Sequence, residues 1–349
     1  MKINHAILHV FDFVACENTF AREEIDITNK TAKNYVARHA GKALTNLDNK
    51  HGEFSADSHF ADELRAYFRG EVGFVDISVE IGEFLARELG HMEKPVSTDL
   101  LVVDFEEGVE AAVADDDPEA AFAGPVPRYF GLFLLESKQA YVHELMYGEV
   151  GERNDIARHH AVLPNPSQKI ASYAVIDLRT LAVLFTDKKR TIAGEECWLI
   201  PDGLLQCSME ASSKETFATV TEIVEAVAEE YGRNAAVALS RAKAYAVENA
   251  DEADDLDLEE MAEVAFESDP VMKERFEAAA QAVELPERVP LAREAVKRVA
   301  KSHKIRTDTG IEVTFPAEYS RNPEYITFTS EADGTISIQL KNIGHIENR

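Results

Sequence analysis

The chain has 349 residues, of which 36 are lysine or arginine and 64 are aspartate or glutamate, giving a formal net charge of -28. This acidity argues against indiscriminate coating of DNA, because affinity for DNA comes largely from cations that displace condensed counterions. No apolar run approaches the roughly 18 residues of a membrane span, and no secretory leader is visible, so we expect a cytoplasmic protein that does not bind membranes.

The first 210 residues mix strand-like and helix-like patterns. Residues 3–14 predict a partly buried strand. Apolar residues at helical spacing predict three helices, at 28–48, 58–69 and 72–89. The period then falls to two and predicts strands at 100–105, 128–136, 139–145, 173–177 and 181–186. Short connections favour antiparallel pairing of these strands, and the acidic insertion 106–124 is expected to be an exposed loop.

The rest of the chain is predicted to be helical and then β. Helices are expected at 213–231, 234–250, 270–283 and, with basic residues, 291–304. A small β-meander should follow, with strands at 311–315, 325–328 and 335–341, and Asp333-Gly334 is a strong signal for its last hairpin. We therefore predict an α+β protein with an antiparallel sheet and flanking helices in an N-terminal domain (1–210), a helical section (211–303) and a small C-terminal β-unit (304–349).

Motifs for catalysis or metal binding are weak. The sequence contains no phosphate-binding loop, dinucleotide fingerprint or nucleophile elbow. The tripeptide Asp308-Thr-Gly310 matches the core of aspartic proteases, but it occurs once and that chemistry needs two carboxylates, so we interpret it as a polar turn. The histidine groupings at 5 and 9 and at 159 and 160 lack a third ligand. We predict a protein that is not an enzyme and that has neither a metal site nor a cofactor.

Two basic patches stand out against the acidic background. Residues 291–308 carry six cations and two acids, a net charge of +4, so the remaining 331 residues carry -32. The predicted helix would place Lys297, Lys301 and Lys304 along one edge. Segregated positive charge is the footprint of a site for a polyanion, although a solvated helix face is the alternative. The candidate DNA-binding residues are Arg293, Lys297, Arg298, Lys301, Lys304 and Arg306, supported by Lys188, Lys189 and Arg190.

Several segments together resemble one known family. They are Ile3-Asn-His-Ala-Ile-Leu-His-Val10, Arg128-Tyr-Phe-Gly-Leu-Phe-Leu-Leu135, Ala161-Val-Leu-Pro-Asn-Pro-Ser-Gln-Lys-Ile170, Lys304-Ile-Arg-Thr-Asp-Thr-Gly-Ile-Glu-Val313 and Asp333-Gly-Thr-Ile-Ser-Ile-Gln-Leu-Lys-Asn-Ile343. In this order and over nearly the whole chain, they resemble the bacterial 37-kDa nucleoid-associated protein family. The resemblance implies association with the nucleoid, by binding DNA or by contact with DNA-handling proteins, and it brings no catalytic residues.

Three functions remain open from the sequence. The first is a non-enzymatic nucleoid-associated protein that contacts the phosphates of double-stranded DNA through its basic patch, without strong sequence preference. The second is an acidic adaptor, whose surfaces around 251–260 would engage the basic faces of nucleoid proteins. An unrecognised enzyme is the third alternative. A homodimer would double a small basic patch, and for that reason we also consider self-association.

Overall fold

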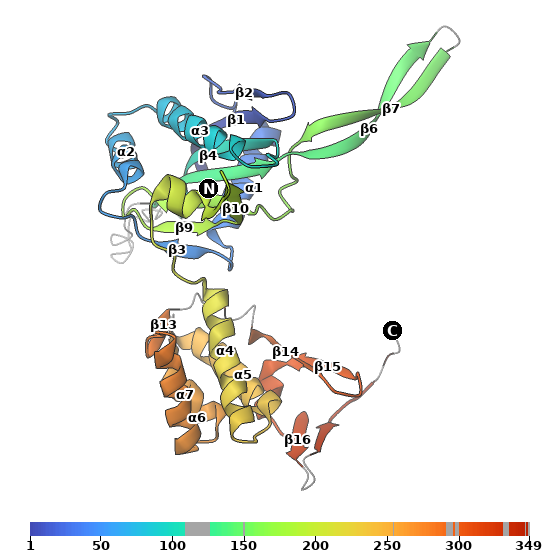
Figure 1. The fold of residues 1–349 in the computed structure, drawn as a ribbon. Coiled ribbons are helices and arrows are strands. Elements are labelled where there is room, and N and C mark those ends of the chain that lie inside the picture. Colours follow the sequence, from blue (N-terminus) through green and yellow to red (C-terminus); the bar gives the residue numbers. More distant parts are fainter. Residues whose placement is uncertain are drawn as a thin grey trace, which may run out of the picture. The chain divides into compact units, whose positions relative to one another are not determined.

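The computed structural model describes residues 1–108, 126–148, 151–253, 255–290, 296, 300–330, 335–345 and 347. The chain divides into two compact units, residues 1–210 and 211–349 (Figure 1). The first is built around an antiparallel sheet and the second around helices, so the predicted α+β class is confirmed. Beyond residue 108, the loop expected at 106–124 lies outside the described residues.

The sheet of the first unit has seven antiparallel strands. In spatial order they are β2 (Glu17–Thr19), β1 (Lys2–Asp12), β4 (Thr98–Glu106), β5 (Arg128–Glu136), β8 (Ser172–Asp177), β9 (Val183–Thr186) and β3 (Lys50–Gly52). The centre of the sheet is the pair β4 and β5, in register from Thr98 opposite Glu136 to Glu106 opposite Arg128. Five of these strands correspond to strands predicted from the sequence.

Helices cover both faces of this sheet. Helix α1 (Lys30–Leu44) packs on the face that carries Leu101 and Val103. Helices α2 (His59–Phe68) and α3 (Phe74–Gly90) pack on the other face, against Leu100 and Val102. Because both faces are buried, β4 is an almost continuous apolar run rather than an alternating strand.

Two further strand pairs and a π-helical turn complete the first unit. Strands β10 (Lys189–Ile192) and β11 (Glu195–Trp198) form a hairpin that leads into the π-helical turn Leu199–Leu205. Strands β6 (Lys138–Gly148) and β7 (Gly151–Val162) form a separate two-stranded arm. The sequence predicted part of β6 but not β7, and β6 pairs with β7 rather than with the main sheet.

The second unit has four main helices around an alanine-rich core. They are α4 (Ser213–Glu230), α5 (Ala235–Glu252), α6 (Leu258–Ala265) and α7 (Pro270–Ala282). Ser212 and Glu215 form a reciprocal capping box at the start of α4, which satisfies backbone N–H groups that the helix itself cannot pair. Strands β12 (Asp255–Asp257) and β13 (Arg288–Pro290) pair beside the helices.

The C-terminal part differs from the prediction in two ways. Strand β14 (Ser302–Arg306) pairs with β15 (Glu312–Pro316), so a basic helix reaching residue 304 is wrong. A 3-10 turn, Ala317–Arg321, leads to a second pair, β16 (Ile326–Ser330) and β17 (Ile336–Leu340), so the strands form two hairpins rather than one meander. The predicted turn at Asp333-Gly334 lies outside the described residues, but its flanking strands pair antiparallel as expected.

Candidate nucleic-acid interface

Strand β14 presents two of the predicted cations to solvent. Its residues alternate, with His303 buried and Lys304 and Arg306 exposed. His303 packs against the Phe315 ring of β15, with the ring centroids 5.5 Å apart. Because side chains two residues apart lie on one face of a strand, Lys304 and Arg306 point the same way. Lys301, just before the strand, is also exposed.

One acid lies within this basic group. Glu312 on β15 is opposite Arg306 in the strand register, and its Oε2 is 2.8 Å from Nζ of Lys304. Both side chains are largely exposed, so solvent screens the pair and a phosphate group could compete for Lys304. The positive charge of β14 is therefore partly neutralised.

Between residues 291 and 300, the segment preceding β14 is described at two positions only, 296 and 300, and both side chains face the core. Val296 and Ala300 are helical and buried among the apolar residues of the second unit. The candidate residues Arg293, Lys297 and Arg298 lie outside the described residues.

The supporting patch belongs to the first unit and is less basic than its sequence suggests. Lys188 pairs with Glu136, with Nζ 2.5 Å from Oε1, and Lys189 lies 3.9 Å from a carboxylate oxygen of Glu196. Both lysines are about half exposed. They and the C-terminal cations thus occur in different compact units.

Arg190 has to be removed from the candidate residues. Its side chain is buried, and its Nη1 lies 2.6 Å from Oδ1 of the equally buried Asp187. A second amino group donates to Oγ of Ser172, 2.7 Å away. Asp187 also accepts a hydrogen bond from the backbone N–H of Ile200. Arg190 therefore neutralises a buried carboxylate and holds the β10 hairpin to the sheet, which leaves no guanidinium surface for a phosphate.

The structure adds two residues to the supporting patch that the sequence analysis missed. Trp198, the single tryptophan, is opposite Lys189 in the β10–β11 pair, and the Lys189 ammonium lies 5.9 Å from the ring centroid. The ammonium of Lys50, on β3, lies 5.6 Å from the same ring. An aromatic ring beside ammonium groups is a common element of nucleic-acid surfaces. Lys50 lies far from Trp198 in the sequence, so only the fold reveals this cluster.

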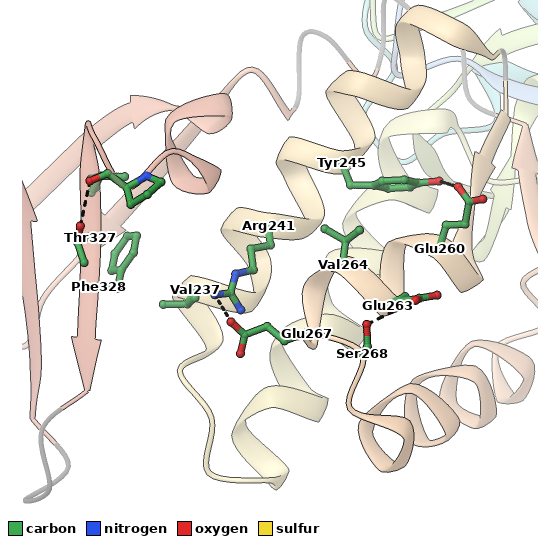
Figure 2. A pocket seen from close by; sticks show the side chains of 12 residues that line it. Val237, Arg241, Tyr245, Glu260, Glu263, Val264, Glu267, Ser268, Thr327 and Phe328 are labelled. Atoms are coloured by element: carbon green, nitrogen blue, oxygen red, sulfur yellow. Dashed lines mark hydrogen bonds and ion pairs between the residues drawn. The ribbon is translucent and has the colours of Figure 1, made fainter.

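The second unit also holds an acidic cavity of about 750 Å³ (Figure 2). Helix α6 and the residues after it supply the acids Glu260, Glu263 and Glu267, while β16 supplies apolar side chains, including Phe328. Glu267 pairs with Arg241, 2.5 Å away, and Glu260 accepts a hydrogen bond of 2.8 Å from Tyr245. One cation against three acids leaves the lining negative, which suits a basic ligand rather than a nucleic acid.

Two neighbouring carboxylates in the first unit, Glu63 and Glu80, lie on α2 and α3. Burial, and to a lesser extent the hydrogen bond and charge of Glu80, raise the pKa of Glu63 to about 7. The two acids line a cavity between α2 and α3 together with His59, whose Nε2 is 3.2 Å from Glu63. Within the described part of the chain, no group of three or more histidine, cysteine or acidic residues is placed to hold a metal ion.

The sequence model of the family described as nucleoid-associated protein YejK matches residues 7–347. The chain belongs to this family. The resemblance inferred from the separate segments is thereby confirmed, and it supports a role associated with the nucleoid. A search of curated proteins found no match. None of the helices among the described residues is long and apolar enough to cross a membrane.

Proposed function

We propose that this protein is a non-enzymatic nucleoid component that binds double-stranded DNA through a local basic patch in its C-terminal part. The contacting residues are Lys301, Lys304 and Arg306, together with Arg293, Lys297 and Arg298 from the preceding segment. The observation that carries the proposal is charge segregation, because a stretch of net charge +4 lies within a chain of net charge -28.

The geometry of β14 supports this proposal. Lys304 and Arg306 share the exposed face of a short strand whose alternate residue, His303, is buried. The strand therefore holds two cations about 7 Å apart, since a strand rises roughly 3.3 Å per residue. Contacts of this kind reach phosphates, position a protein on the duplex and carry no sequence information. We accordingly propose binding without strong sequence preference.

The acidic remainder of the protein limits this binding. Interactions between exposed charges more than about 8–10 Å apart are screened at physiological salt, so a local patch can act despite the net charge. Lys188 and Lys189 in the first unit, with Lys50 beside Trp198, are proposed as a weaker secondary contact. Repulsion by the acidic faces would keep the protein from coating DNA.

Charge reversal on the described cations tests the proposal. The double variant Lys301→Glu/Lys304→Glu should weaken binding to a labelled duplex at least about tenfold at low salt. The matched control, Lys30→Glu/Lys33→Glu, makes the same charge change at exposed positions of α1 and should have a much smaller effect. Equal losses for the two variants would mean that net charge, rather than this patch, governs binding.

The acidic cavity favours a second function, that of an adaptor for basic proteins. Its three glutamates and the apolar side chains that line it would suit a partner segment that carries lysine or arginine beside apolar side chains. The variant Glu260→Gln/Glu263→Gln tests it, because it keeps the side-chain shape while removing two charges. We expect it to reduce capture of basic nucleoid proteins and leave duplex binding unimpaired. Loss of DNA binding without loss of protein capture would contradict the adaptor function.

A further inference from the structure

The two-stranded arm β6–β7 leaves the sheet of the first unit and extends away from it (Figure 1). Its strands pair only with one another among the described residues, and every residue from 141 to 147 is exposed. An isolated two-stranded hairpin is at best marginally stable in water, and it usually needs a further strand or a packed face. The two strands of the arm are 11 and 12 residues long. We therefore expect a partner surface to stabilise the arm.

The exposed apolar side chains gather on one face of the arm. Tyr141, Leu145 and Tyr147 alternate along β6, and Ile156 on β7 is opposite His143, which lies on the same face. Their exposed fractions are 72%, 65%, 84% and 75% in that order. The other face has two large apolar side chains, Val142 and Met146, which are less exposed at 39% and 46%. We call the face that carries Tyr141, Leu145, Tyr147 and Ile156 the apolar face of the arm.

Charges on the apolar face are distributed unequally along its length. Near the tip, Glu152 is opposite Tyr147, and near the root, Arg158 is opposite Tyr141. Arg158 donates a hydrogen bond to Oε1 of Gln139, a neutral amide that does not cancel its charge. Six residues of strand separate the acid from the base, about 20 Å, so they cannot pair within one arm.

We propose that this face joins two copies of the chain, with their arms packed face to face and antiparallel. The tip of each arm then lies over the root of the other. Glu152 of each copy meets Arg158 of the second copy, tyrosines 147 and 141 come together, and Leu145 and Ile156 fill the centre. Because the acid and the base lie at opposite ends of the face, a two-fold axis brings the acid of each copy to the base of the other. The face is therefore complementary to itself, as an isologous interface requires.

The composition of the arm favours a second copy of the chain, rather than DNA, as the partner of the apolar face. Residues 138–162 contain three lysines or arginines and four acids, whereas a DNA-binding arm needs an excess of cations. Four large side chains from each copy would together bury on the order of 1,000 Å², which is the lower limit for specific interfaces. Aromatic residues, here two tyrosines per copy, are the side chains that such interfaces favour.

The first test is the mass of the full-length protein by sedimentation equilibrium, from about 1 to 50 μM, since a dimer is concentration-dependent. We expect twice the chain mass of 38.8 kDa. Leu145→Glu should raise the dissociation constant roughly 100-fold or more, because it places a charge at the centre of the interface. The matched control, Val142→Glu, makes the same change on the opposite face and should leave the dimer largely intact. Both positions are exposed, so circular dichroism should show unchanged folds.

A charge exchange tests the antiparallel arrangement. Glu152→Arg and Arg158→Glu should each weaken the dimer, and the double variant should restore it, because the exchanged charges meet again between copies. A monomer at every concentration would overturn the proposal, as would equal weakening by Leu145→Glu and Val142→Glu. If Leu145→Glu left the mass unchanged and abolished duplex binding, the face would belong to DNA and the proposal would be wrong.

Discussion

Lys304 and Glu312 form an ion pair across the β14–β15 hairpin, with 2.8 Å between Nζ and Oε2. The acid is opposite Arg306 in the register, so it reduces the charge of two cations on one exposed face. If β14 contacts phosphates, this carboxylate opposes binding by repelling the DNA and by occupying Lys304. Binding then requires the phosphate to compete with an acid that belongs to the protein itself.

The variant Glu312→Gln should consequently bind duplex DNA more tightly than the unmodified protein. Freeing one cation for a phosphate should steepen the dependence of log K on log salt by roughly 0.9. Fluorescence anisotropy at several salt concentrations measures both quantities. Glu277→Gln, an identical change at an exposed position on α7, is the control, and a similar gain in that variant would show that Glu312 has no special role.

Arg190 provides a prediction about stability rather than binding. Arg190→Met leaves the buried Asp187 carboxylate without its cation, and breaking a buried pair in this way costs roughly 3–5 kcal/mol. Lys189→Met, at the neighbouring exposed position, should cost less than about 1 kcal/mol. Urea denaturation followed by circular dichroism compares the two. Equal stabilities of the two variants would contradict the assignment of Arg190 as a structural residue.

The burial of His303 leads us to expect that the stability of the protein depends on pH. Burial, with a smaller contribution from Lys243, lowers the pKa of His303 to about 4, whereas the unfolded chain has the ordinary value of 6.5. Between these pH values the unfolded state binds more protons, so the free energy of unfolding falls as pH decreases from about 6.5 towards 4. At pH 5 this single group lowers the free energy of unfolding by about 2 kcal/mol relative to pH 8.

His303→Phe should therefore flatten the acid side of the stability curve. Phenylalanine keeps a ring against Phe315 and has no proton to bind. Urea denaturation at pH 5 and pH 7.5 gives the difference in unfolding free energy, which should be smaller in the variant. His51→Phe, at an exposed position, is the control. An unchanged difference in the His303 variant would show that this histidine is not protonated on unfolding.

The central sheet could be predicted from the sequence because its signals are local. The segment 100–105 is apolar at every position except Asp104, and the structure buries it between two helical layers as strand β4. Helix α1 begins after Asn29, whose side chain accepts a hydrogen bond from the backbone N–H of Thr31, a cap visible in the sequence. The order of the strands was not predictable, since β3 pairs with β9 across more than 130 residues.

Strands β7 and β14 escaped prediction for different physical reasons. In β7, polar residues occupy positions where a buried strand would have apolar ones, because no described residue outside the arm pairs with it and its side chains are mostly exposed. In the sequence, Lys304 continues the helical spacing of Lys297 and Lys301. The structure instead buries His303 against Phe315 and forms a strand there. Tertiary packing thus decided the structure of the segment that carries Lys304 and Arg306.

The most direct test of DNA binding is the salt dependence of affinity for a short labelled duplex. If about five phosphates are neutralised by the C-terminal cations, log K should fall with log salt at a slope of roughly -4 to -5 between about 50 and 200 mM. A slope near zero, or no binding by folded protein at the lowest salt, would contradict direct contact with DNA through this patch.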